Sequence, residues 1–122
     1  MFKNFLIVAL GGAIGSSVRY GSYLLVGPRS FPVSTLLINI IGSFIIGIVI
    51  GVGLKNNDFP NELKLFFAVG ICGGFTTFSA FAIENLNLLQ TGKYFLCFFY
   101  IVSSLLLGIA AAWFGYHLGL KS

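Results

Sequence analysis

The sequence predicts an all-α membrane protein with four transmembrane helices. Of its 122 residues, 57% are hydrophobic and 8% are charged, whereas an ordinary soluble domain has about 25% charged residues. So few polar side chains cannot cover so much apolar surface, which excludes a soluble enzyme, and a disordered chain would need low hydrophobicity and high net charge. A membrane-spanning helix takes about 20 apolar residues. Four spans with short connectors therefore use the whole chain, residues 1–122, as a single domain.

The first two spans are separated by prolines. An apolar block over residues 4–26 ends shortly before Pro28, and a second block over residues 33–54 begins after Pro32. Proline is tolerated in the first turn of a helix. Both blocks are predicted to be helices, because lipid offers the backbone no hydrogen-bond partner outside the segment itself.

The last two spans follow two short polar connectors. The third covers residues 61–89, after the connector that runs from Lys55 to Pro60, and the fourth covers residues 94–120, after a turn at Gly92. Connectors this short make successive helices antiparallel. We therefore expect both termini on the same side of the membrane.

Lysine and arginine are almost balanced between the two sides of this bundle. The net charge is +4, and the charges are scattered singly through apolar sequence, which does not indicate nucleic-acid binding. The side of the termini carries Lys3, Lys55, Lys64 and Lys121, and the other side carries Arg19, Arg29 and Lys93. A strong excess on one side normally fixes orientation, so the balance indicates insertion in both orientations. A weakly biased single topology is the alternative.

Small residues recur every four positions on three of the predicted helices. The glycines on these faces are Gly11 and Gly15, Gly47 and Gly51, and Gly115 and Gly119. In membranes such faces let helix backbones approach closely. We expect oligomerisation to use them, and packing within one chain is the alternative.

The third span contains the stretch GGFTTFSAF over residues 73–81. Glycine is permissive in its backbone angles and threonine hydroxyls satisfy freed backbone groups, so this stretch predicts a break in the helix within residues 73–79. Transport proteins use such breaks as ion sites. Phe78 and Phe81 lie three residues apart, and their weakly positive ring edges would attract a small anion without binding it tightly. Ordinary packing phenylalanines are the alternative.

Few other polar groups interrupt the spans, and polar groups in a membrane are usually functional or paired. No acid lies within the first, second or fourth span. This absence disfavours a proton relay of carboxylates and favours passage of something that needs hydrogen-bond donors. Arg19 either attracts anions into an aqueous vestibule or extends to the lipid headgroups. Glu84 is expected near the membrane boundary.

Three motifs together resemble the small fluoride channels of the Fluc or CrcB family. They are GGAIG at residues 11–15 leading to Arg19 and Tyr20, TLLINIIG at residues 35–42, and the stretch at residues 73–81. The match runs in order across essentially the whole chain. The sequence departs from the family pattern at two positions: Ala80 stands where relatives often carry a hydroxyl residue, and Ser34 stands where they often have glycine.

The resemblance implies a passive channel that exports fluoride across the plasma membrane, built as an antiparallel, dual-topology homodimer with two pores. By similarity, the pore residues that bind fluoride are Asn39, Phe78, Ser79, Phe81, Tyr100 and Ser104. Arg19 and Glu84 would lie in the vestibule. The backbone carbonyls of Gly73 and Thr76 would bind a central structural sodium ion.

Two other hypotheses remain at this stage. A dual-topology drug–proton antiporter of similar size wants a membrane-embedded carboxylate, usually in its first helix, and this chain has none there. A structural or accessory membrane subunit needs no aligned polar groups, so Asn39, Phe78 and Tyr100 would then tolerate bulky apolar replacements.

Overall fold

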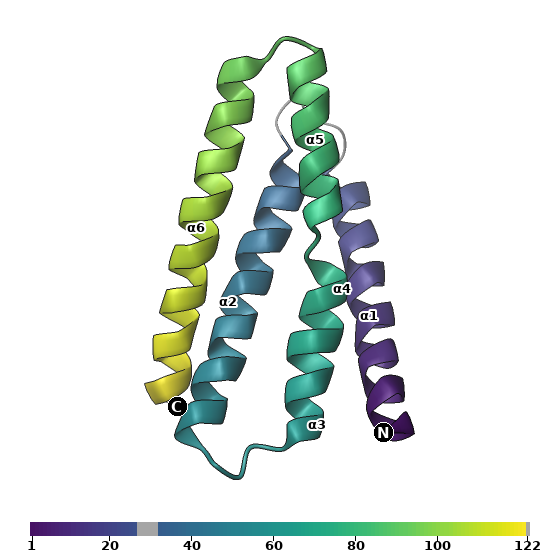
Figure 1. The fold of residues 1–122 in the computed structure, drawn as a ribbon, viewed down its shortest axis with the longest axis vertical. Coiled ribbons are helices and arrows are strands. Elements are labelled where there is room, and N and C mark those ends of the chain that lie inside the picture. Colours follow the sequence, from purple (N-terminus) through teal and green to yellow (C-terminus); the bar gives the residue numbers. More distant parts are fainter. Residues whose placement is uncertain (27–31, 122) are drawn as a thin grey trace.

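The computed structural model describes residues 1–26 and 32–121 and consists of four long helical segments (Figure 1). Three segments are continuous helices, namely α1 (Phe2–Val26), α2 (Val33–Lys55) and α6 (Tyr94–Lys121). The third segment is composed of α3 (Asn61–Lys64), the π-helix η1 (Leu65–Cys72), α4 (Gly73–Phe75) and α5 (Phe78–Gln90). The four predicted helical segments are confirmed. The predicted stop around Pro28, with the charge of Arg29, lies outside the described residues.

Successive segments run in opposite directions. Figure 1 shows the N- and C-termini at the same end of the molecule, with the connector between α2 and α3 at that end and the turn between α5 and α6 at the other. The predicted antiparallel arrangement is therefore confirmed.

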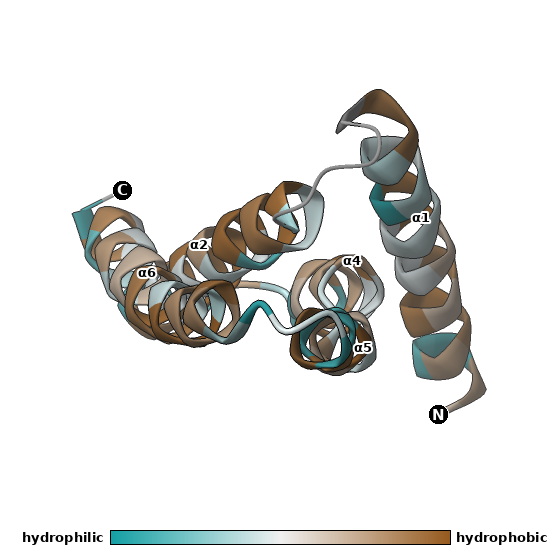
Figure 2. Cartoon of the chain, turned by 90° about the horizontal axis from the view of Figure 1, so that it is seen from above, coloured by the Kyte–Doolittle hydropathy of each residue, from teal (hydrophilic) through white to brown (hydrophobic). Residues whose placement is uncertain are grey.

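All four segments are long and apolar enough to cross a membrane. Large hydrophobic side chains point outward along them: Leu25 is 90% exposed, Phe95 79% and Phe5 67%. Figure 2 shows hydrophobic residues distributed over each helix. Exposed apolar surface on this scale marks a membrane-facing or protein-facing surface rather than a water-facing one. The chain is a multi-pass membrane protein.

Glycines on α1 allow this helix to pack closely against η1 and α4 of the third segment. A Cβ added at Gly11 would lie 2.9 Å from the Cα of Gly70, and one added at Gly15 would lie 2.9 Å from the backbone nitrogen of Phe75. Real Cβ atoms do not approach this closely, so only glycine permits the contact.

A second glycine contact joins α2 to α6. A Cβ at Gly47 would lie 3.0 Å from the backbone nitrogen of Tyr116, and one at Gly119 would lie 2.9 Å from that of Val52. The expectation that the small-residue faces serve oligomerisation is therefore wrong for these glycines. These glycines pack within the chain. Few polar side chains join its helices, so close approach of the backbones supplies van der Waals attraction between them.

The small core lies where α6 meets α5 and α2. Tyr100 and Thr35 are completely buried, and Ile38 is 2% exposed. Leu88 and Cys97 pack with Tyr100, and the ring of Phe81 lies against this cluster. The core thus fixes one end of the interrupted third segment.

Candidate functional site

The third segment is interrupted at Thr76 and Thr77, within the predicted range. Thr76 (φ −85°, ψ 152°) and Thr77 (φ −152°, ψ 129°) are both extended, between the helical residues Phe75 and Phe78. These angles are in the β region, which suits a β-branched residue. The predicted break is confirmed, although the glycines do not make it.

The paired glycines serve close packing and open space instead. Both belong to α4, and Gly73 has ordinary helical angles (φ −62°, ψ −37°). A Cβ at Gly74 would lie 2.6 Å from the carbonyl oxygen of Gly12 on α1, whereas one at Gly73 would meet no atom within 4 Å. The missing side chain at Gly74 therefore lets α1 pack closely, whereas the missing side chain at Gly73 leaves empty space next to the backbone.

Side chains supply hydrogen bonds that a continuous helix would have made across the break. The N–H of Thr77 donates to Asn39 Oδ1 (3.3 Å), and the N–H of Ala80 donates to Thr77 Oγ1 (3.3 Å). Thr77 is thus the N-cap of α5. The carbonyl of Cys72 keeps the backbone N–H of Thr76 (2.9 Å) and accepts a second hydrogen bond from Thr76 Oγ1 (2.7 Å). Specific partners hold the break open.

Two backbone carbonyls lose their usual donors as a result. In an α-helix the N–H of each residue donates to the carbonyl four residues earlier, so Thr77 would serve Gly73 and Ala80 would serve Thr76. Both N–H groups donate to side-chain oxygens instead. Gly73 and Thr76 line the same pocket.

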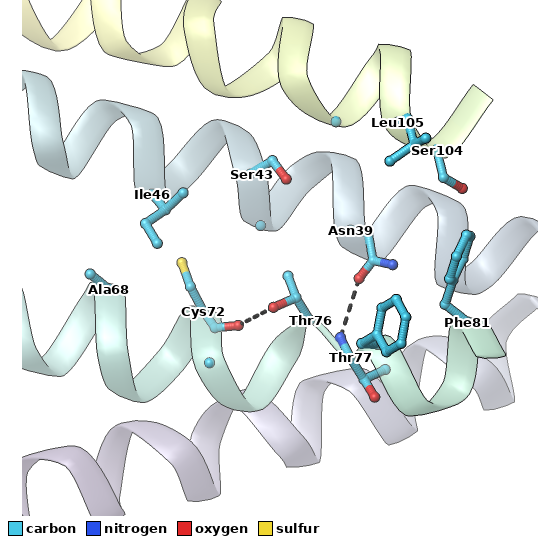
Figure 3. Close-up of a pocket in the computed structure, with 14 residues that line it drawn as sticks. Asn39, Ser43, Ile46, Ala68, Cys72, Thr76, Thr77, Phe81, Ser104 and Leu105 are labelled. Atoms are coloured by element: carbon cyan, nitrogen blue, oxygen red, sulfur yellow. Dashed lines mark hydrogen bonds between the residues drawn. The ribbon is translucent and has the colours of Figure 1, made fainter. Parts of the chain in front are cut away.

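The pocket at the break has a volume of about 430 Å³ (Figure 3). Its walls come from α2, α6 and both halves of the third segment. The predicted site residues on these walls are Asn39, Gly73, Thr76, Phe78, Phe81 and Ser104. Figure 3 shows Asn39, Thr77 and Ser104 at one end, and Ile46 and Ala68 at the other.

The pocket wall has no fixed charge. Among its lining residues within the described part of the chain there is no Asp, Glu, Lys, Arg or His. Within that same part, no cluster of three or more His, Cys, Asp or Glu side chains could bind a metal ion. The chemistry of the pocket is therefore that of amide, hydroxyl, backbone and aromatic groups.

The two predicted pore rings are neighbours. The ring centroids of Phe78 and Phe81 are 5.8 Å apart with the planes tilted by 42°, and Phe81 lies 5.0 Å from the ring of Tyr100. Phe78 is 79% exposed, whereas Phe81 is half-buried. In a single chain the ring pair is therefore covered on one side only.

The two predicted serines have different surroundings. Ser79 is exposed, and its Oγ is 3.0 Å from Thr77 Oγ1 just outside the pocket. Ser104 lines the pocket, and its Oγ is buried without a hydrogen-bond partner in the structure. A buried hydroxyl in this state costs free energy unless a ligand or water completes it.

Tyr100 and Glu84 form a polar cluster next to the pocket. Glu84 accepts hydrogen bonds from the Tyr100 hydroxyl (3.0 Å) and from Thr35 Oγ1 (2.8 Å), and Tyr23 OH lies 3.2 Å from Thr35 Oγ1. The sequence did not identify Thr35 and Tyr23 as site residues. The signal for Thr35 is its position four residues before Asn39 on one face of α2.

Arg19 lies beside the break rather than at a helix end. Its Nε donates to the carbonyl of Gly74 (3.2 Å), and the side chain is partly buried. The predicted roles of Arg19 and Glu84 in a vestibule stay predictions.

Comparison with known proteins identifies relatives over nearly the whole chain. The sequence model of the family described as CrcB-like protein, Camphor Resistance (CrcB), matches residues 6–116. A protein of Azobacteroides pseudotrichonymphae is 44% identical over 121 residues, which cover 97% of each chain. One of Thermus thermophilus is 46% identical over 120 residues (96% of this chain, 95% of the relative), and one of Flavobacterium psychrophilum is 41% identical over 116 residues (93% and 94%).

Each of these three relatives is named as a fluoride-specific ion channel, FluC. Together with the four spans, they confirm the predicted family and a multi-pass protein of the plasma membrane.

Proposed function

The chain belongs to the CrcB-like family, and from that premise we propose that it is a passive, fluoride-selective channel that exports fluoride from the cytoplasm. Like its relatives, it is a transport protein rather than an enzyme. The pathway runs along the pocket at the break.

The observation that carries this proposal is the uncharged pocket built around the interrupted helix. A small anion gives up its hydration there only if donors replace the water. Asn39 lies at the break and has an amide that can donate, and the Ser104 hydroxyl lacks a partner. A pathway with weak, multiple donors lets the ion leave as well as enter.

The aromatic rings and two further hydroxyls continue this pathway. Phe78 and Phe81 offer their ring edges, which carry weak positive charge, and the two rings are adjacent on the pocket wall. Ser79 adds a hydroxyl at the N-terminus of α5, where the helix dipole favours an anion. Tyr100 contributes its hydroxyl when that hydroxyl donates to the ion in place of Glu84.

The pathway is completed by a second copy of the chain in the opposite orientation. Gly73 and the ring of Phe78 are exposed on one face of the monomer, so a partner is needed to exclude lipid from the ions. The balance of lysine and arginine between the two sides supports an antiparallel dimer. Two copies related in this way have two equivalent pathways.

The freed carbonyls support a structural sodium ion between the two copies. Gly73 and Thr76 both line the pocket, and their carbonyls have lost their helical donors. Unwound carbonyls at the C-terminal end of a half-helix are the ligands that transport proteins use for sodium. Sodium bound there would supply positive charge close to the anion pathway.

Fluoride efflux from proteoliposomes tests the proposal. Purified protein should release fluoride when valinomycin lets potassium leave the vesicle with it, without any proton gradient, and should retain chloride. Phe81→Ile should abolish the release, because an aliphatic side chain has no positive edge to offer. Phe98→Ile is the matched control, since Phe98 is 68% exposed on α6, away from the pocket. Release that requires a proton gradient would instead identify an antiporter.

Cysteine labelling in cells tests the antiparallel dimer separately. Asn57 lies in the exposed α2–α3 connector, at the same end as the termini, whereas Cys72 and Cys97 are buried. In intact spheroplasts, a membrane-impermeant maleimide should label about half of the Asn57→Cys protein, because dual insertion places the connector on both sides. Complete labelling or none would contradict dual topology.

A further inference from the structure

We infer that Arg19 is a positioning residue that holds the break of the third helix open, through its hydrogen bond to the Gly74 carbonyl. The inference rests on the proposed function only in assigning the break to the ion pathway. It differs from the role in a vestibule that family resemblance implies, because the structure directs Nε to the backbone.

The break creates a need for this donor. The N–H that would serve Gly74 in a continuous helix belongs to Phe78, which starts α5 on the far side of two extended residues. A carbonyl without a donor is costly in a membrane, where no water replaces the missing hydrogen bond. Arg19 Nε supplies the missing donor at 3.2 Å.

Arg19 completes a set of side chains that replaces the lost backbone bonds. Asn39 on α2 accepts the N–H of Thr77, and Thr77 Oγ1 accepts the N–H of Ala80. Arg19 acts from α1, on the other side of the third segment. The break is thus held from both flanking helices, so removing one partner lets the backbone close toward regular helix.

The glycine face of α1 aims Arg19 at its target. Gly15 packs directly against the turn between Ile71 and Phe75, and Arg19 lies one turn beyond Gly15 on the same face. A guanidinium at the C-terminal end of α4 is also favourable, because the carbonyls there carry the negative end of the helix dipole.

Two substitutions separate the donor from the charge. Counting from Cα, glutamine places an N–H donor at the same atom position as arginine Nε, without a charge. Lysine keeps the charge but has a methylene group at that position. A positioning role predicts that Arg19→Gln keeps the saturating fluoride flux within about threefold of the original. Arg19→Lys should lower it at least about tenfold, as expected for a lost hydrogen bond to a charged group.

The concentration dependence adds a second readout. Attraction of anions by charge would appear in the half-saturating fluoride concentration, whereas a misplaced break lowers the maximal flux. Arg19→Lys with flux near the original, or Arg19→Gln with an at least about tenfold higher half-saturating concentration, would overturn the inference in favour of charge attraction.

A spectroscopic readout does not depend on fluoride transport. The dipeptide Gly74-Phe75 is the only Gly-Phe pair in the sequence, so ¹³C-carbonyl glycine with ¹⁵N-phenylalanine gives one resonance pair in bilayer samples. The Gly74 carbonyl signal should move upfield in Arg19→Lys and stay in place in Arg19→Gln. An unmoved signal in Arg19→Lys would overturn the inference, whereas absence of fluoride flux in the original protein would overturn only the proposed function.

Discussion

Asn39→Asp is the substitution that probes the anion pathway most selectively. A carboxylate still accepts the N–H of Thr77, which now donates to Asn39 Oδ1 at 3.3 Å, so the break should survive. The change replaces the amide donor with a negative charge on the wall of the pocket.

The size of the effect follows from Coulomb repulsion. Two like charges about 4 Å apart repel by about 4 kcal/mol at an effective dielectric constant of about 20. Since about 1.4 kcal/mol is a factor of ten in rate, fluoride flux should fall about a thousandfold. Screening that halved this energy would still leave a reduction of about thirtyfold.

The assay is fluoride efflux from vesicles at pH 7.5, where the new carboxylate is ionised. Asn87→Asp is the control, because it adds the same charge at an exposed position on α5 that does not line the pocket. The control should conduct like the original protein. Flux through Asn39→Asp within a factor of about three of the original would refute the reasoning, because an anion could not then pass so close to the new charge.

Three further predictions concern the helix contacts and the break. Gly47→Ala should lower the thermal midpoint of the detergent-solubilised protein, because its Cβ would overlap the carbonyl oxygen of Ala112, whereas Gly53→Ala should leave the midpoint unchanged, with its nearest contact at 3.8 Å. Thr77→Val should destabilise α5 by about 1 kcal/mol through loss of its cap, and Thr77→Ser should not; hydrogen exchange of the α5 amides measures this, and equal protection in both variants would contradict it. Phe81→Met should keep more fluoride flux than Phe81→Ile, because a methionine side chain is more polarisable and adaptable; equal loss in vesicle efflux would contradict a contribution of side-chain polarisability at this position.

The sequence was sufficient for the spans and the break because both depend on local chemistry. Apolar length defines a membrane helix, and the GGFTTF run has few favourable ways to continue as a regular helix. The sequence did not determine which residues of this run are extended, because glycine and threonine both permit a break. The structure assigns it to Thr76 and Thr77 and uses Gly74 for packing against α1.

The partners of the site residues could not be predicted, because they depend on how the helices are rotated against one another. Spacing placed Arg19 beyond a glycine face but could not show that the face packs against α4, and hence that Nε reaches Gly74. For the same reason the hydrogen bonds of Glu84 to Thr35 and Tyr100 were not foreseen. A pattern along one helix gives its faces, but the neighbour on each face is a tertiary property.

The glycine faces illustrate the same limit. Repeated small residues correctly predicted close backbone contact, yet they cannot indicate whether the partner helix belongs to the same chain. Gly47 and Gly119 both meet helices of their own chain. The surface for a second copy is instead expected around the exposed Gly73 and Phe78.

The reversal potential in a planar bilayer tests the central claim most directly. With purified protein and a tenfold fluoride gradient, in which an impermeant anion balances the charge, the current should reverse at about 59 mV, the value for a perfectly selective monovalent ion. Replacing the fluoride with chloride should leave no measurable current. A reversal near zero, or a chloride current of similar size, would contradict an uncharged, donor-lined pathway for fluoride.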